Sequence, residues 1–256
     1  MDFQDIVYEV NDRVATIRIN RPEVYNAFRI KTMEEMTRAF DMADADTSVR
    51  VVVLTGTGEK AFSTGGDVDM ETKFDGNAGR HVGRMLIRLA EAIRGTGKPV
   101  IAKIRGWCVG GGNELNLLCD LSIATRGSRF THTDARLGNS PIWYATQLLP
   151  LHMSDKRARE VVMLGKTYSA EDAERLGWIN EVVDDDKLDV VVDDWCKRLV
   201  LSSPQSLRLS KVSMNQLSDM MLNSVRQGFE TLAYIHDTAE FHEGTAAFLE
   251  KRPPKF

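Results

Sequence analysis

Two glycine-rich segments each lead to an acidic side chain. Ser63-Thr64-Gly65-Gly66 runs directly into Asp67, and Gly110-Gly111-Gly112 is followed within two residues by Glu114. Glycine has no side chain to keep a ligand atom away from the backbone. A helix that begins near Gly111 would also point its first, unpaired amides outward at the positive end of its dipole. One amide from each segment would then form a two-donor oxyanion hole.

Two carboxylates accompany these glycines. Glu114 falls in the first turn of the expected helix, and Asp134 follows the next expected strand. Carboxyl groups beside one oxyanion hole can divide the roles of proton donor and proton acceptor. Simpler interpretations stay open, because glycines at strand ends are often turns and a glutamate in a first helical turn is favoured by the dipole alone. A dinucleotide loop is disfavoured, since no segment completes GxGxxG and no Walker lysine follows.

Strands and helices alternate along the segments that must position these residues. Period-two alternation predicts a hairpin, and apolar residues at helical spacing predict a helix up to about Asp46. The predicted order is strands 6–10 and 14–19, the helix to Asp46, strand 50–56, a helix around 85–93, strand 99–104, a helix from Gly111 and strand 120–125. This order indicates the α/β class, with parallel βαβ units and ligands bound at strand ends.

The remainder of the sequence is mostly helical. From Pro141 onward one strand is expected at 178–183, Ser203-Pro204 separates two long helices, and the tail 251–256 is expected to be loose. The 256 residues are 43% hydrophobic and 27% charged, which is typical of a globular protein. A formal net charge of −4 disfavours nucleic acid as a partner.

Composition and cysteine usage indicate a cytoplasmic protein without a metal. The three cysteines have no CxxC spacing, the N-terminus has no signal-peptide pattern, and no apolar run is long enough for a membrane span. His236 and His242 are six residues apart and do not share a helical face, so no metal site is expected. Among the histidines, His132 is the candidate for a pocket wall because it lies two residues before Asp134.

An ordered set of short motifs resembles the crotonase (enoyl-CoA hydratase/isomerase) superfamily and spans nearly the whole chain. The motifs are Asn20-Arg21-Pro22, Asn26-Ala27, KAFSTGGD from Lys60, Gly106 with GGGNEL from Gly110, Cys119-Asp120, Glu243-Gly244 and FLEKR from Phe248. The resemblance implies a spiral of ββα units over 1–195 and a helical C-terminal trimerisation region over 196–256. It further implies a homotrimer or a dimer of trimers that acts on acyl-CoA thioesters.

The same resemblance assigns roles to individual residues. The amides of Gly66 and Gly111 would hold the thioester oxygen, and Glu114 and Asp134 would transfer protons at the substrate double bond. Contacts to coenzyme A are expected from Tyr25, Ala27, Thr64, Gly65, Asp67 and Gly110. Coenzyme A enters only as part of the substrate, so no separate cofactor and no metal are expected. The implied reaction is the hydration of a 2-enoyl-CoA.

Several departures from the family pattern keep alternatives open. Asp134 stands where hydratases carry a glutamate, so its side chain is shorter by roughly 1.5 Å. Trp143 and Tyr144 stand where small residues are usual, so they either reshape the acyl pocket or pack a helix. The chain also resembles dihydroxynaphthoyl-CoA synthases and 2-ketocyclohexanecarboxyl-CoA hydrolases, although it lacks their site residues. An alicyclic substrate, ring-opening C–C hydrolysis, double-bond isomerisation and a non-catalytic CoA-ester-binding protein are the alternatives.

Overall fold

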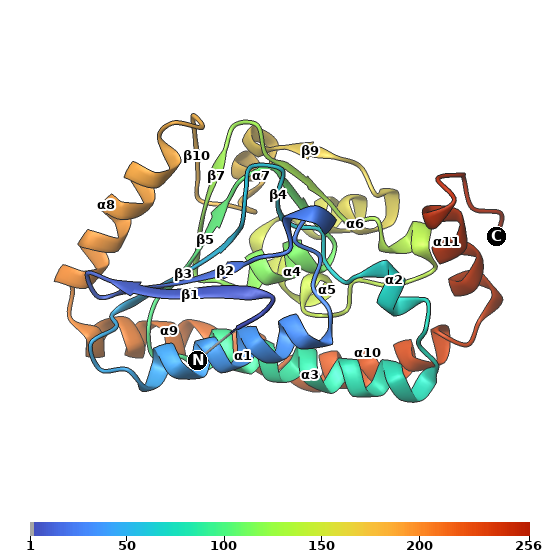
Figure 1. Ribbon diagram of the computed structural model, residues 1–256, viewed down its shortest axis with the longest axis horizontal. Helices are drawn as coiled ribbons and strands as arrows, with labels where there is room; N and C mark the ends of the chain where they lie inside the picture. Colours follow the sequence, from blue (N-terminus) through green and yellow to red (C-terminus); the bar gives the residue numbers. More distant parts are fainter. Residues whose placement is uncertain (1–2) are drawn as a thin grey trace.

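The computed structural model describes residues 3–256, which form two β-sheets covered by helices (Figure 1). The larger sheet has the order β1-β2-β3-β5-β7-β10 and the smaller one the order β4-β6-β8-β9. Strands of the larger sheet are β1 Ile6–Asn11, β2 Val14–Ile19, β3 Val51–Gly56, β5 Val100–Ile104, β7 Leu121–Thr125 and β10 Glu181–Val183. Strands of the smaller sheet are β4 Ala61–Ser63, β6 Trp107–Val109, β8 Arg129–Thr131 and β9 Tyr168–Ser169.

The helices follow the strands in chain order. They are α1 Ile30–Ala45, α2 Val68–Glu71, α3 Gly76–Gly95, α4 Gly111–Leu118, α5 Ala145–His152, α6 Asp155–Leu164, α7 Ala170–Leu176, α8 Leu188–Leu201, α9 Pro204–Asp219, α10 Leu222–Ile235 and α11 Ala239–Leu249. Two 3-10 turns, η1 Pro22–Val24 and η2 Asp134–Leu137, complete the set. In Figure 1 α1, α3, α9 and α10 form a layer below the sheets, and α11 stands at the end of the molecule opposite α8.

The chain winds as a spiral of ββα units, as the resemblance implied. In successive turns the first strand joins the larger sheet and the second joins the smaller one: β3 with β4, β5 with β6, and β7 with β8. Neighbouring turns pair in parallel, with Val52 opposite Val100 in the larger sheet and Trp107 opposite Arg129 in the smaller one. Parallel pairing brings the carboxyl ends of β4 and β6 side by side. The segments that follow these two strands are the two glycine-rich loops.

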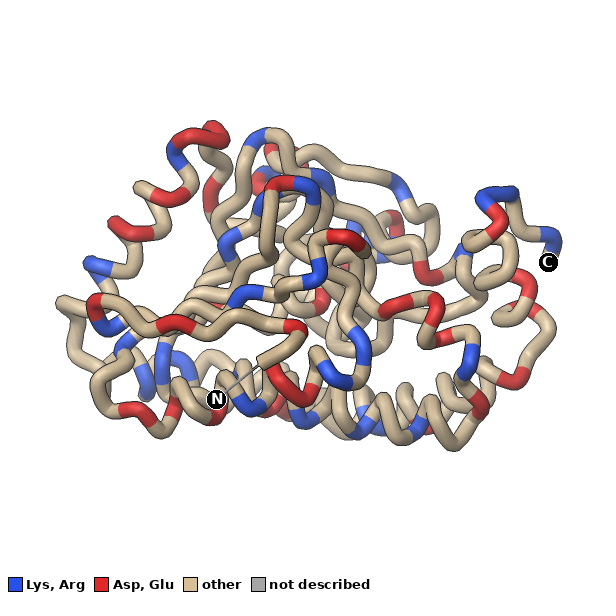
Figure 2. Tube along the Cα trace, viewed as in Figure 1, with Lys and Arg blue, Asp and Glu red and all other residues tan. Residues whose placement is uncertain are grey.

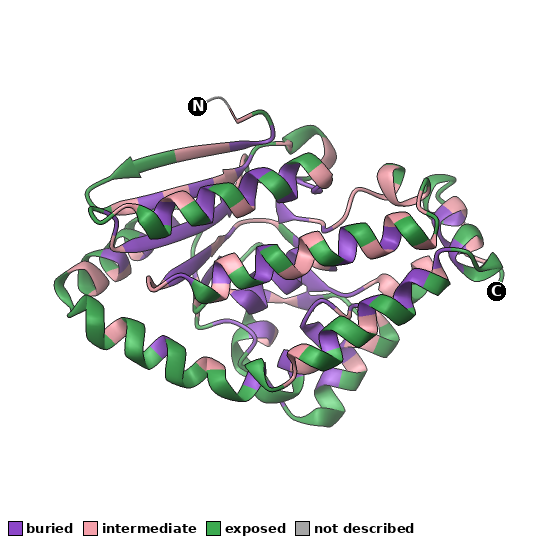
Figure 3. Cartoon of the chain, turned by 90° about the horizontal axis from the view of Figure 1, so that it is seen from below, coloured by how far each residue is buried: buried purple, intermediate pink, exposed green. Residues whose placement is uncertain are grey.

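The hydrophobic core lies between the larger sheet and the helical layer. Phe40 of α1, Leu54 of β3 and Leu89 of α3 are fully buried in it. Figure 3 shows the same pattern, with the inner faces of the helices buried and their outer faces exposed. The other face of the sheet packs on α8, where Val53 and Ile101 contact Leu188 and its neighbours. Burial on both faces explains why β3 reads as a continuous apolar run.

Most predicted elements are confirmed, but two features differ from the expectations, the short strands and the tail. The strands β4, β6, β8 and β9 were not predicted, because two or three residues are too few to show a period. The tail is not loose: Arg252 donates two hydrogen bonds to Glu243, at 2.6 and 2.9 Å, and the Lys255 amide donates a third. These contacts lower the pKa of Glu243 to about 2. The boundary expected at residue 195 falls within α8.

The helices of residues 3–256 include none that is both long and apolar enough to span a bilayer.

Candidate active site

The two glycine-rich loops touch each other between the sheets and α4. The Phe28 amide donates to the Gly65 carbonyl at 2.8 Å, which ties the first loop to the segment before α1. Gly65 has φ +87° and Gly110 has φ +50°, conformations that L side chains rarely adopt. A Cβ on Gly111 would lie 2.7 Å from the Phe28 ring and 3.2 Å from the Gly65 Cα. The close approach of the loops therefore requires glycine at this position.

Two backbone amides are free to receive a ligand at this contact. The Gly111 amide is the first of α4, and Gly66 lies in the isolated bridge with Phe28. Neither amide has a hydrogen-bond acceptor within residues 3–256. Gly66 and Gly111 both line a pocket of about 590 Å³. The positive end of the α4 dipole adds to the potential there, so the pair can stabilise a negatively charged oxygen.

Glu114 lies one turn into α4 and is 5% exposed. Its Oε1 accepts a hydrogen bond from the Ala145 amide at 3.4 Å, and no Lys or Arg within residues 3–256 pairs with it. Burial, followed by the charge of Asp134, raises the pKa of Glu114 well above its ordinary value. This shift favours the protonated form of the Glu114 side chain, which is the form that a proton donor needs.

Asp134 begins η2 and lines the same pocket. Both of its carboxylate oxygens would lie 3.8 Å from a Cβ placed on Gly110. His132 does not line the pocket but holds Asp134, since its Nδ1 lies 3.3 Å from Asp134 Oδ2. The fully buried His132 ring stacks on Trp178 with an interplanar angle of 3°. The structure thus brings all four expected catalytic residues to one pocket.

The residues expected to contact coenzyme A lie along the wall of this pocket, with one exception. Tyr25, Ala27, Thr64, Asp67 and Gly110 line it, whereas Gly65 is buried and does not.

Arg21 organises part of that wall. It pairs with Asp67 at 2.9 Å and donates to the Ala27 carbonyl at 2.7 Å. Arg21 therefore ties the first glycine-rich loop, at Asp67, to the segment before α1, at Ala27, which explains the place of Arg21 in the first motif.

Glu71, the last residue of α2, was not expected in the pocket. A Cβ on Gly66 would lie 2.0 Å from Glu71 Oε1, so this carboxylate lies against the glycine loop. Burial, then the charges of Asp134 and Asp67, raises its pKa to about 7. The signal in the sequence is weak, because α2 is a four-residue helix without a period. Figure 2 shows the acidic residues of the α2 segment next to the central part of the molecule.

The two aromatic residues that depart from the family pattern have different places. Trp143 lines the pocket and is anchored by a 2.8 Å hydrogen bond from its Nε1 to the Leu86 carbonyl of α3. Tyr144 is not among the residues that line the pocket, is 2% exposed, and lies under the Arg94 guanidinium at 5.3 Å. Trp143 therefore shapes the pocket, and Tyr144 packs the protein interior.

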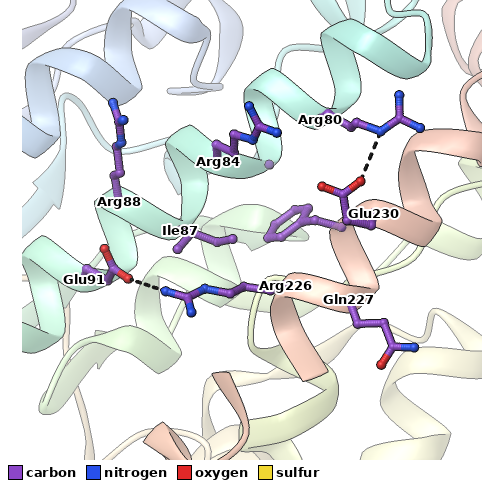
Figure 4. A pocket seen from close by; sticks show the side chains of 10 residues that line it. Arg80, Arg84, Ile87, Arg88, Glu91, Arg226, Gln227 and Glu230 are labelled. Atoms are coloured by element: carbon purple, nitrogen blue, oxygen red, sulfur yellow. Dashed lines mark hydrogen bonds and ion pairs between the residues drawn. The ribbon is translucent and has the colours of Figure 1, made fainter. Parts of the chain in front are cut away.

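A second hollow, of about 420 Å³, lies on the surface between α3 and α10 (Figure 4). Its arginines are partly neutralised within the groove: Arg80 pairs with Glu230 at 3.1 Å and Arg226 with Glu91 at 3.4 Å. It contains neither glycine loop nor the Glu114 and Asp134 pair. Within residues 3–256 no group of three or more His, Cys, Asp or Glu side chains is arranged to hold a metal ion.

Comparison with known families gives a match over almost the whole chain. The sequence profile described as enoyl-CoA hydratase/isomerase covers residues 9–256. The chain belongs to this family. The pocket therefore lies in an enoyl-CoA hydratase/isomerase fold, and the chain is a crotonase-type enzyme.

Solved structures of other members are similar over their full length. An enoyl-CoA hydratase from Mycobacterium avium subsp. paratuberculosis is 25% identical, with a TM-score of 0.91, and the match covers 100% of this chain and 99% of that one. An enoyl-CoA hydratase from Bacillus anthracis is 30% identical, with a TM-score of 0.81 and 99% of each chain covered. A structure described as an enoyl-CoA hydratase subunit I from Geobacillus kaustophilus is 33% identical, with a TM-score of 0.81 and coverage of 100% and 99%.

Proposed function

We propose that this enzyme adds water to the double bond of a 2-enoyl-CoA. The observation that carries the proposal is that Glu114 and Asp134 share one pocket with the Gly66 and Gly111 amides. A hydration needs donors for the thioester oxygen and two groups that exchange protons with water and with Cα. These four residues supply both requirements. Coenzyme A would lie along the wall formed by Tyr25 and the other residues expected to contact it.

The proposed mechanism passes through a thioester enolate. The amides of Gly66 and Gly111 bind the thioester oxygen and stabilise the negative charge that develops on it. The carboxylate pair shares a proton, as expected for two coupled acids in one site. Water bonds to Cβ and gives its proton to the ionised carboxyl group, while the protonated group gives its proton to Cα. The pair then returns to its starting state by exchanging a proton across the pocket.

The charge of the pocket favours hydration over ring-opening hydrolysis. Five acidic residues and no Lys or Arg line it within residues 3–256: Asp67, Asp69, Glu71, Glu114 and Asp134. Cleavage of a C–C bond by water would create a new carboxylate next to these groups, where like charges repel. Product masses separate the remaining alternatives, since isomerisation leaves the mass unchanged. Hydration adds one water without creating an acid.

The decisive variant is Glu114→Gln. Because the amide cannot exchange the proton, we expect kcat for 2-enoyl-CoA hydration to fall by about 10²–10⁴-fold. The Kd for a saturated acyl-CoA, measured by calorimetry, is expected to stay within a few-fold of wild type. Glu34→Gln, which removes an exposed carboxylate from α1, is the matched control. A kcat near wild type in Glu114→Gln would refute the assignment.

A further inference from the structure

The carboxylate of Asp134 has a single side-chain partner within residues 3–256, the His132 ring. The His132 Nδ1 lies 3.3 Å from Asp134 Oδ2, whereas Oδ1 has no hydrogen-bond partner in the same part of the chain. The Asp134 side chain is 15% exposed and lines the pocket. The contact with His132 therefore uses one oxygen of the carboxylate and leaves the other without a protein partner.

Two contacts fix the His132 ring. The ring is fully buried and stacks on Trp178, with 6.0 Å between the ring centres and an interplanar angle of 3°. Its Nε2 is also buried and has no hydrogen-bond partner among the described residues, so Asp134 is the only polar partner that they give the ring. A neutral imidazole carries its hydrogen on one nitrogen only, and the contact with a carboxylate assigns that hydrogen to Nδ1. His132 therefore donates, and Asp134 accepts.

The backbone beside His132 is tied to the start of α4. The Thr131 carbonyl accepts a hydrogen bond from the Gly110 amide at 3.0 Å and a second one from the Asn113 side chain at 2.8 Å. Asn113 is fully buried, so water does not compete for this second bond. The His132 side chain therefore projects from a segment whose position relative to the second glycine-rich loop and to Glu114 is fixed.

We propose that the Nδ1–H of His132 holds Oδ2 of Asp134 and thereby directs Oδ1 into the pocket for proton transfer. His132 is then a positioning residue, because it acts through Asp134 and does not line the pocket itself. An aspartate side chain is short, so a small rotation withdraws its oxygen from the reacting atoms and slows the transfer. This role rests on the proposed hydration, in which Asp134 is one of the two groups that exchange protons.

Two variants separate the hydrogen bond of His132 from its packing. His132→Asn can place an amide nitrogen at the position of Nδ1 but removes the stack on Trp178, whereas His132→Phe keeps an aromatic stack and removes the donor. We expect kcat for 2-enoyl-CoA hydration to fall by about 10–100-fold in His132→Phe, with KM within about threefold of wild type. His132→Asn should keep kcat within about fivefold of wild type, since the donor is retained. A role in packing alone predicts the opposite order of the two variants.

A second comparison shows whether His132 acts through Asp134. Once Asp134→Asn has removed the proton-transfer group, the further change His132→Phe should not lower kcat any more. His81→Phe makes the same substitution at an exposed position of α3 and should keep wild-type kinetics. Thermal melting shows whether each variant folds. The proposal is overturned if His132→Phe keeps the wild-type kcat, or if the double variant is slower than Asp134→Asn.

Crystal structures of the variants provide a measurement that does not depend on turnover. The Asp134 carboxylate should have the same direction in the wild type and in His132→Asn, and it should turn in His132→Phe. If the wild type hydrates no 2-enoyl-CoA but the carboxylate behaves in this way, the proposed reaction fails and the positioning role stands. An unchanged carboxylate in His132→Phe would overturn the positioning role whatever the reaction is.

Discussion

The acid groups of the pocket differ in how visible they are in the sequence. Glu114 could be predicted because it follows a glycine-rich loop at the start of an expected helix. Asp134 could be predicted because it follows the next strand. Glu71 could not, because α2 folds back over the loop and only the three-dimensional contact with Gly66 brings it into the pocket. His132, the histidine considered as a candidate for the pocket wall, holds Asp134 from the buried side. Contacts between side chains from different turns of the spiral leave no local pattern.

The raised pKa of Glu71 has a consequence for stability. In the unfolded chain its carboxyl group titrates near 4.5, and in the folded protein near 7. Between these values the folded state binds more protons than the unfolded state, so the free energy of unfolding falls as the pH rises. After allowance for its partial exposure, the loss is about 1–3 kcal/mol between pH 4.5 and pH 8.

Replacing Glu71 by glutamine should remove this pH dependence. We expect Glu71→Gln to have a higher Tm than the wild type at pH 8 and a similar one at pH 4.5, as measured by calorimetry. Glu34→Gln serves as the reference, and its Tm should change with pH as the Tm of the wild type does. If Tm changes with pH by the same amount in Glu71→Gln and in the wild type, the Glu71 carboxyl group is paired or solvated in the folded protein.

At the scale of elements, the order of the long strands and helices follows from hydrophobic periodicity. The hairpin of β1 and β2, the buried β3 and the start of α4 at Gly111 are confirmed. The short strands β4 and β6 carry the loops to the site, yet they are hidden in the sequence because three residues show no alternation. Their pairing depends on the spiral, in which each turn supplies one strand to the smaller sheet. The resemblance to the family, rather than periodicity, predicted that spiral.

The contact between the loops makes Gly111→Ala informative. The added methyl group would meet the Phe28 ring and the Gly65 backbone and displace the first turn of α4. We expect kcat/KM to fall by about 10²–10³-fold, as for the loss of one oxyanion donor, and stability to fall by about 1–3 kcal/mol. Steady-state kinetics and thermal melting check the two effects.

Gly95→Ala provides the matched control, because a Cβ at this end of α3 meets no atom within 4 Å. It should keep wild-type kinetics and an unchanged or higher Tm. Normal activity in Gly111→Ala would show that the loops can separate without disturbing the donors.

At the scale of the whole molecule, α9 presents apolar side chains to solvent. Figure 3 shows that it is exposed along most of its length. The exposed apolar residues are Leu209, Val212, Met214 and Leu217 of α9 and Met220, which directly follows it, with exposed fractions from 54% to 81%. A surface of this kind is typical of a subunit interface. It supports the proposal that the protein is a homotrimer or a dimer of trimers.

Light scattering tests that assembly. The wild type should have three or six times the chain mass of 28.7 kDa. Met214→Glu places a charge on the most exposed part of the apolar surface and should shift the protein to a smaller species. Gln216→Glu adds a charge to an already polar, exposed position of the same helix and should leave the mass unchanged. A monomeric wild type would contradict the proposed assembly.

The two candidate donors for the thioester oxygen are main-chain amides. A change in the side chains of the pocket is therefore separate from a change in these donors. A substitution at Glu71, Glu114 or Asp134 alters a side chain but leaves the Gly66 and Gly111 amides in place. Thioester activation and the fate of the activated acyl group can therefore vary independently. Redesign of this protein for a different acyl-CoA reaction should begin with the three carboxylates and leave the glycine loops and Phe28 untouched.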